Sequence, residues 1–194
     1  MKKLLVIGIF SFIIAPLSLF GQNRSIQRFE FEVAGGGIYP NVRDGIPAAP
    51  GFQVLGEFRY NISDLFDVGL QVLFNEFCRD NFLISEYHTY SNYALYSYSD
   101  YNWRAARDLN FFLGAGVGAS FIEDYKYFVH SEDGKNQRDK MTYFSVSPRF
   151  GVELFNQLRL TVEYKLPGFP FNWNGYAYSY FGVNIGYAFG GRNK

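Results

Sequence analysis

Apolar residues occupy every second position along most of the chain from residue 28 to residue 189, and polar or small residues stand between them. A period of two places successive side chains on opposite faces of an extended chain, so it indicates β-strands and not helices. The clearest segment is residues 158–166, in which Leu158, Leu160, Val162, Tyr164 and Leu166 alternate with Arg159, Thr161, Glu163 and Lys165. The pattern predicts an all-β chain.

Seven other segments share this alternation, over residues 28–39, 52–60, 66–77, 91–103, 109–121, 143–154 and 177–189. Only Phe155-Asn156-Gln157 separates segment 143–154 from segment 158–166. This short connection predicts a tight hairpin with Asn156 in the left-handed conformation. Within 91–103, Ser97 and Ser99 dilute the apolar face, and a β-bulge is expected there. The chain thus has eight predicted strands.

The connections between the predicted strands alternate in length. Residues 61–65, 104–108 and 155–157 are short, whereas 40–51, 78–90, 122–142 and 167–176 are long. Outer-membrane barrels have this asymmetry, because their periplasmic turns are short and their external loops are long. Alternation alone would also fit a soluble binding barrel with its apolar face inward, so that alternative stays open. The connections favour an eight-stranded antiparallel up-and-down transmembrane β-barrel with a polar lumen.

The first 21 residues have the composition of an export signal. Met1-Lys2-Lys3 is positively charged, and Leu4 to Ile14 is an apolar run too short to span a bilayer. Cleavage is expected after Gly21, which would leave residues 22–194 as a single barrel domain. No later apolar stretch reaches the roughly 18 residues that a membrane helix needs, so any spanning structure must consist of strands.

Composition adds two further constraints. The chain has no net formal charge, and aromatic residues make up 21% of it although its mean hydropathy is only -0.11. This balance is typical of a barrel that is apolar outside and polar inside, and nothing in it indicates nucleic-acid binding. Cys78 is the only cysteine, so no disulfide within the chain can stabilise the fold.

Charged residues fall on the polar face of the predicted strands. The interior of an eight-stranded barrel is just wide enough for side chains to fill it, and charges confined there must be paired. We expect a structural charge network, with a narrow solute path as the alternative, and glycines at 114, 116, 118, 182 and 186 that leave room for larger lumen side chains. The expected members of the network are Arg28, Glu30, Glu32, Glu57, Arg59, Asp67, Asp100, Arg149, Glu153, Arg159, Glu163 and Lys165.

Candidate catalytic chemistry is sparse. His88 and His130, the only histidines, fall in or beside predicted external loops. His88 precedes Ser91 with a spacing that would turn the two side chains to opposite faces of a strand, which does not suit a lipid A deacylase. The acidic pairs Glu123-Asp124 and Glu132-Asp133 lack the spacing of a calcium loop. We therefore expect no catalytic residue, no metal site and no cofactor.

Three segments carry a resemblance to a known family. They are Ser147 to Leu154 with its tight hairpin, Asp100-Tyr101-Asn102-Trp103, and the final strand Phe181 to Gly191. In these segments the chain resembles the small eight-stranded outer-membrane barrels of the OmpA/OmpX type, in the form common among Bacteroidetes-like Gram-negative bacteria. The resemblance implies that Tyr187 and Phe189 serve as the signal for the outer-membrane insertion machinery, although the tail after Phe189 departs from barrels that end at the aromatic residue.

Together these observations predict a non-enzymatic integral outer-membrane protein with a filled lumen. It would reach the outer membrane by Sec-type export and serve envelope structure or surface interaction through its long loops. Its expected partners are outer-membrane lipid and lipopolysaccharide, periplasmic chaperones with the insertion machinery, and an extracellular ligand on the loops. We expect a monomer. A narrow porin-like channel and a lipid A-modifying enzyme are the alternatives.

Overall fold

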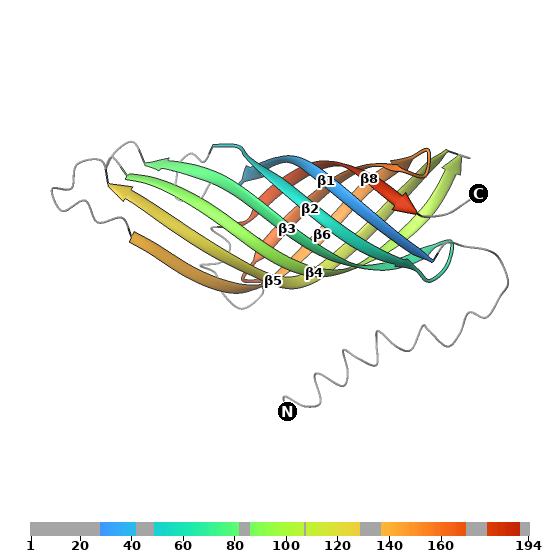
Figure 1. The fold of residues 1–194 in the computed structure, drawn as a ribbon, viewed down its shortest axis with the longest axis horizontal. Coiled ribbons are helices and arrows are strands. Elements are labelled where there is room, and N and C mark those ends of the chain that lie inside the picture. The colour runs from blue at the N-terminus through green and yellow to red at the C-terminus, as the bar shows by residue number, and fades with distance from the viewer. Residues whose placement is uncertain are drawn as a thin grey trace, which may run out of the picture.

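The computed structural model describes residues 28–41, 49–81, 86–106, 108–128, 137–169 and 178–190. Its strands form one closed antiparallel barrel, in which each strand pairs with its neighbours in sequence and β8 pairs with β1 (Figure 1). The predicted fold is therefore confirmed. The strands are β1 (Phe29–Pro40), β2 (Gly51–Asn61), β3 (Phe66–Asn81), β4 (Glu86–Ala106), β5 (Leu109–Phe128), β6 (Gln137–Leu154), β7 (Leu158–Pro167) and β8 (Tyr180–Gly190).

Several predicted features lie outside the described residues. They are the export signal with its cleavage point, His130 with its acidic neighbours, and the tips of the four long connections. No helix in the described part of the chain is long and apolar enough to cross a membrane. We call the end of the barrel with the short connections the turn end and the opposite end the loop end.

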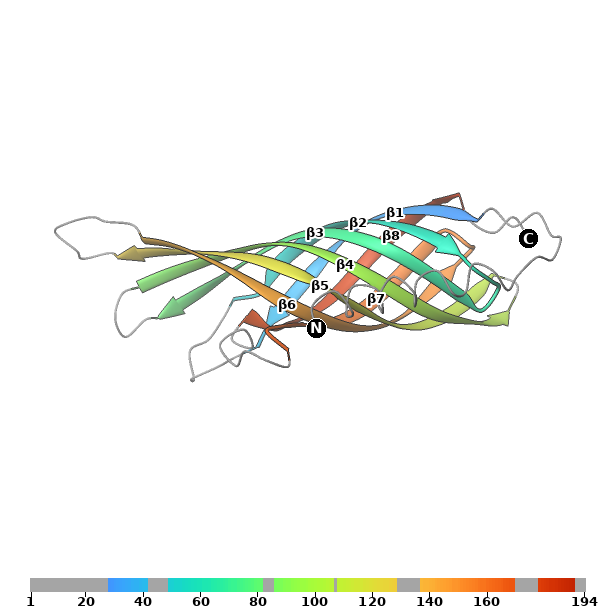
Figure 2. The same cartoon turned by 90° about the horizontal axis from the view of Figure 1, so that it is seen from below.

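Strands β3 to β6 extend beyond the other strands at the loop end (Figures 1 and 2). The predicted loops 78–90 and 122–142 are therefore wrong over most of their length, because β3 and β4 leave only residues 82–85 between them and β5 and β6 only 129–136. The outward face becomes polar at Glu76, Ser91 and Glu123, which ends the apolar alternation. The hydrogen-bonded ladder nevertheless continues past this level.

The hairpin between β6 and β7 forms as predicted. Asn156 has a φ of 58° and Phe155 a φ of 53°, and Gln157 N donates to Leu154 O at 3.1 Å. Two central residues with positive φ give the twist that two antiparallel strands need. The bulge expected within 91–103 is wrong, since β4 pairs with β5 without interruption up to Arg104 and the register shifts only between Arg104 and Ala106.

Inward glycines on β5 allow large lumen side chains to lie flat on the barrel wall. A Cβ atom at Gly114 would lie 1.8 Å from Oδ1 of Asp100, and one at Gly116 would lie 2.5 Å from the Tyr98 ring. Real Cβ atoms do not approach other atoms so closely, so the glycines admit these two neighbours. The two glycines of β5 therefore leave room in the lumen for the inward side chains of β4.

Candidate functional site

The outer surface of the barrel is apolar on all eight strands. Large apolar side chains at outward positions are half exposed, among them Phe31, Val54, Leu70, Leu95, Leu113, Val117, Phe150, Leu160 and Ile185. A soluble monomer rarely exposes a contiguous apolar patch larger than a few hundred Å². The apolar face therefore surrounds the barrel and does not form its core.

Aromatic side chains gather at both limits of this apolar surface. At the turn end Trp103 stacks on Phe111 with ring centroids 5.7 Å apart, and at the loop end Phe74 lies 5.1 Å from Tyr93. From Phe111 to Phe121 the outward positions of β5 cover about 33 Å along the strand, or about 25 Å along the barrel axis at a tilt of about 40°. This height matches the apolar band of outer-membrane barrels.

The lumen contains a charge network centred on Arg149. Its guanidinium group donates to both carboxylate oxygens of Glu57 at 2.5 and 2.7 Å, and to both of Asp100 at 2.8 and 2.6 Å. It also lies over the Tyr98 ring, 3.8 Å from the centroid. All three ionic groups are buried, so one cation binds two carboxylates with the bidentate geometry that gives strong pairs.

A second part of the network lies around Arg59 and Arg159. Arg59 forms ion pairs with Glu30 and, at 2.9 Å, with Glu32. Arg159 lies 3.5 Å from Glu32 and 3.2 Å from Asp100, and its guanidinium carbon is 3.7 Å from the Phe112 ring centroid. The shared carboxylates connect this part to Arg149.

Lys165 completes the network on the β7 side. Its Nζ lies 2.9 Å from a carboxylate oxygen of Glu163 and donates to Oε1 of Gln71 at 2.9 Å. It also donates to the Tyr98 hydroxyl. Buried amides extend the network, since Gln53 donates to Glu163 at 2.8 Å. The sequence places both amides on the polar face of β2 and β3, but the expected charge network did not include them.

Two of the twelve expected lumen residues differ from the others. Arg28 is exposed and donates to the Tyr60 hydroxyl at 3.3 Å, so its placement in the lumen is wrong. It precedes the first residue of β1, where strand alternation no longer sets the side-chain direction. Glu153 is only half-buried and lies at the turn end of the lumen. Tyr187 and Phe189 point outward, with ring centroids 4.9 Å apart.

An apolar layer closes the lumen above the charges. We call it the aromatic plug, and it consists of Ile38, Phe77, Tyr90, Ile122, Tyr143 and Tyr180. Tyr180 is fully buried, and its hydroxyl accepts a hydrogen bond from Asn75 at 2.6 Å. This layer was not predicted from the sequence, in part because Tyr90 and Ile122 lie in segments predicted to be loops. The alternation that turns Asn75 and Asn92 inward continues through these residues, and this was the signal in the sequence for the layer.

Above the apolar band, an exposed cluster on β5 and β6 surrounds Glu123. Arg138 and the Tyr125 hydroxyl donate to one carboxylate oxygen of Glu123, and Lys140 lies 3.1 Å from the other. The hydrogen bond from Arg138 is the main reason that the pKa of Glu123 falls from its ordinary 4.5 to about 2. The pairing is therefore complete above pH 4.5 and is lost as the pH falls through about 2.

This arrangement predicts the titration of Glu123. We expect its carboxyl carbon to titrate with a midpoint near pH 2 in an NMR experiment on the folded protein. Arg138→Gln should move the midpoint toward 4.5, and Lys140→Gln should move it less, because Arg138 contributes most to the shift. A midpoint that the Arg138 substitution leaves unchanged would contradict this assignment.

His88 lies on β4 and not in a loop. Its Nδ1 is 3.0 Å from Oδ1 of Asp124, and its ring stacks on Tyr90. Ser91 lies on the opposite face of the strand, where its hydroxyl donates to Glu76 at 3.2 Å. The separation of His88 from Ser91 is confirmed, so these two residues do not form a nucleophile and base pair. In the described segments, no three His, Cys, Asp or Glu side chains group to hold a metal ion.

The chain matches no family model, and no curated protein matches it in sequence. Its structure is similar to the crystal structure of neisserial surface protein A, with a TM-score of 0.55 and 13% identity over 85% of this chain and 98% of that chain. The fold is that of a small outer-membrane β-barrel. A weaker likeness is to Pseudomonas aeruginosa outer membrane protein OprG, with a TM-score of 0.47 and 14% identity over 86% of this chain and 100% of that chain. Another is to the N-terminal β-barrel domain of P. aeruginosa OprF, with a TM-score of 0.46 and 14% identity over 85% of this chain and 100% of that chain.

Proposed function

We propose that this protein is an integral outer-membrane barrel without enzymatic activity, which is closed to bulk solute and serves envelope structure or surface interaction. One observation carries the proposal: apolar side chains cover the outside of the barrel, while Arg59, Arg149, Arg159 and Lys165 are buried in its lumen. Lipid is the medium that accepts such an exterior, and a closed barrel leaves no unpaired strand edge within it.

Closure of the lumen follows from its contents. The charge network and the aromatic plug lie in series along the barrel axis, and both consist of buried side chains. A hydrated ion that crossed the barrel would have to separate buried ion pairs and then pass an apolar layer. Both steps are costly, because desolvated charges without a partner are unfavourable by several kcal/mol.

Conductance measurements test this closure. We expect the purified protein, inserted into planar bilayers from a folded sample, to show no current steps above the baseline. The folded state is verified on the same sample by its mobility on a detergent gel before boiling. Stepwise conductance from protein that is folded by this criterion would support a narrow channel and contradict the proposal.

The absence of enzymatic activity is supported by the placement of His88 and Ser91 on opposite faces of β4. The alternative, a lipid A-modifying enzyme, predicts a change in lipid A mass when the protein is overexpressed. We expect the lipid A mass spectrum to be the same with and without overexpression.

The family and the route of assembly are part of the same proposal. We assign the chain to the OmpA/OmpX-like barrels of the Bacteroidetes type, exported by the Sec pathway and inserted by the outer-membrane machinery with the help of periplasmic chaperones. Tyr187 and Phe189 support this, because both rings face outward near the end of the last strand. The extension of β3 to β6 at the loop end would carry the loops that meet an extracellular ligand. Lipopolysaccharide would surround the exposed Glu123 cluster, and the barrel would act as a monomer.

A further inference from the structure

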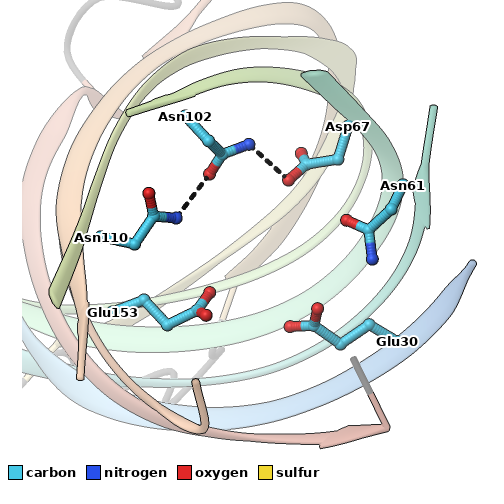
Figure 3. Close-up of a pocket in the computed structure, with 6 residues that line it drawn as sticks. All are labelled: Glu30, Asn61, Asp67, Asn102, Asn110 and Glu153. Atoms are coloured by element: carbon cyan, nitrogen blue, oxygen red, sulfur yellow. Dashed lines mark hydrogen bonds between the residues drawn. The ribbon is translucent and has the colours of Figure 1, made fainter. Parts of the chain in front are cut away.

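The two ends of the lumen differ in the side chains that close them. At the turn end, three carboxylates and three carboxamides line a cavity of about 10 Å³ (Figure 3). At the loop end the aromatic plug consists of aliphatic and aromatic side chains, and Met141 and Tyr178 pack against it. Met141 is the only methionine in the chain besides Met1. The loop end of the lumen therefore contains a thioether, which is a group that can be oxidised reversibly.

Two tyrosine hydroxyls converge on the sulfur atom of Met141. The hydroxyls of Tyr143 and Tyr178 each donate to Sδ at 3.4 Å, and the ring centroids of these two tyrosines are 5.9 Å apart. Tyr143 follows Met141 by two residues on β6, whereas Tyr178 precedes β8. A thioether sulfur is only a weak acceptor. The two phenol donors therefore contact an atom that uses their hydrogen-bonding capacity poorly.

The sulfur lies where a small water-soluble oxidant can reach it. Met141 pairs with Ile122, one residue beyond the pair of Phe121 with Thr142 at the loop-end limit of the apolar surface. Met141 and Tyr178 are both partly exposed. An oxidant in the water at the loop end therefore meets the thioether without crossing the apolar band or the charge network.

We propose that Met141 is a modification site, which hydrogen peroxide oxidises to methionine sulfoxide and at which Tyr143 and Tyr178 bind the new oxygen. A lone pair of the sulfur attacks one peroxide oxygen, and the O–O bond breaks. The attacked oxygen stays on the sulfur, and the other oxygen leaves as hydroxide and takes up the remaining proton to give water. The sulfur loses two electrons and the peroxide gains them, so the peroxide is the only co-reactant.

The position of the two hydroxyls determines what this oxidation does to the fold. Oxidation of methionine normally disrupts an apolar layer, because it turns a flexible apolar side chain into a polar one. A buried polar oxygen without a donor is unfavourable. At Met141 both donors already lie at the sulfur, and the sulfoxide oxygen is a stronger acceptor than the thioether. The barrel should therefore keep its stability when Met141 is oxidised.

Peroxide treatment of the folded barrel tests both parts of the inference. The mature protein is folded in a non-ionic detergent, treated with hydrogen peroxide, and digested for mass spectrometry of the peptide that contains Met141. We expect one added oxygen on this peptide at a peroxide concentration that oxidises free methionine, and little change in the urea midpoint of unfolding in vesicles. In Tyr143→Phe/Tyr178→Phe, which keeps both rings and removes both hydroxyls, the same oxidation should lower the midpoint by about 0.5 M.

Three further variants complete the experiment. Met141→Leu has no thioether, so any change in its midpoint after treatment measures oxidation elsewhere, such as at the exposed Cys78. Tyr39→Phe/Tyr101→Phe removes two hydroxyls from exposed outward positions and should respond to peroxide as the wild type does. Tyr178→Phe alone, at a partly exposed position, should show a smaller shift in the same direction, which gives a measurement if the double variant of the plug does not fold.

Two results would overturn the proposal. One is the absence of sulfoxide at Met141 in folded wild-type protein, and the other is an equal loss of stability on oxidation with and without the two hydroxyls. Either result would leave the membrane assignment intact, because the gel mobility of the same folded sample measures that assignment separately.

Discussion

Replacement of Arg149 by methionine is expected to lower the free energy of unfolding by about 3–5 kcal/mol. The guanidinium group makes four hydrogen bonds to Glu57 and Asp100, all within a buried part of the lumen. Without it, the remaining cationic contacts are longer, at 3.7 Å from Arg59 to Glu57 and 3.2 Å from Arg159 to Asp100, and Gln71 still donates to Glu57 at 3.0 Å. Two buried anions with incomplete compensation are the main cost. Equilibrium urea unfolding in lipid vesicles measures the effect.

Arg138→Met is the matched control for this substitution. Arg138 also forms an ion pair with a carboxylate, that of Glu123, but its side chain is exposed beyond the apolar band. Exposed ion pairs contribute little to stability because water screens them, so this substitution should change the free energy of unfolding far less than Arg149→Met does. A similar loss of stability in both variants, or none in either, would show that burial of the lumen network does not determine the strength of its ion pairs.

Introduction of arginine at Val117 is expected to destabilise the barrel by about 2–4 kcal/mol in a bilayer. Val117 lies on the outward face of β5, 51% exposed and midway between the aromatic residues that limit the apolar surface. In water such an exposed position would tolerate a charge, whereas in a bilayer the same charge would lie within hydrocarbon. Urea unfolding in vesicles with Val117→Arg therefore distinguishes the two environments.

Phe155→Arg serves as the comparison. Phe155 is 68% exposed but lies in the hairpin between β6 and β7, beyond the turn-end limit of the apolar surface. Arginine there should change stability by no more than about 1 kcal/mol, because the cost of a charge falls to that level near the interface. If Val117→Arg were as mild as Phe155→Arg, the exposed apolar face would not be in contact with lipid.

Much of this architecture is predictable from the chain because a strand has only two faces. The segment 158–166 was predicted within one residue of β7, and its parity placed Arg159, Glu163 and Lys165 inward, where they are buried. The short hairpin at Asn156 followed from residue type and length. Alternation along a strand predicts the side-chain direction well here, because a barrel this narrow gives each inward side chain little choice of direction.

Other features depend on contacts between distant strands, which periodicity does not contain. Arg149 binds Glu57 across 92 residues, and no local pattern selects that partner over another inward carboxylate. The extension of β3 to β6 was missed because its outward face is polar, and Tyr90 and Ile122 of the aromatic plug were missed with it. Likewise, parity placed Asp67 and Glu153 inward, but only the closed barrel brings them to one cavity with Asn110.

The central claim is that the apolar face of the barrel contacts lipid and the charged face fills a closed lumen. Its most direct test is the mobility of the native protein on a detergent gel, boiled and unboiled, after separation of outer membranes, inner membranes and soluble protein. We predict that the protein is found in the outer-membrane fraction and that boiling changes its mobility. A protein in the soluble fraction whose mobility does not depend on boiling would contradict the account, because its apolar face would then have to be the core.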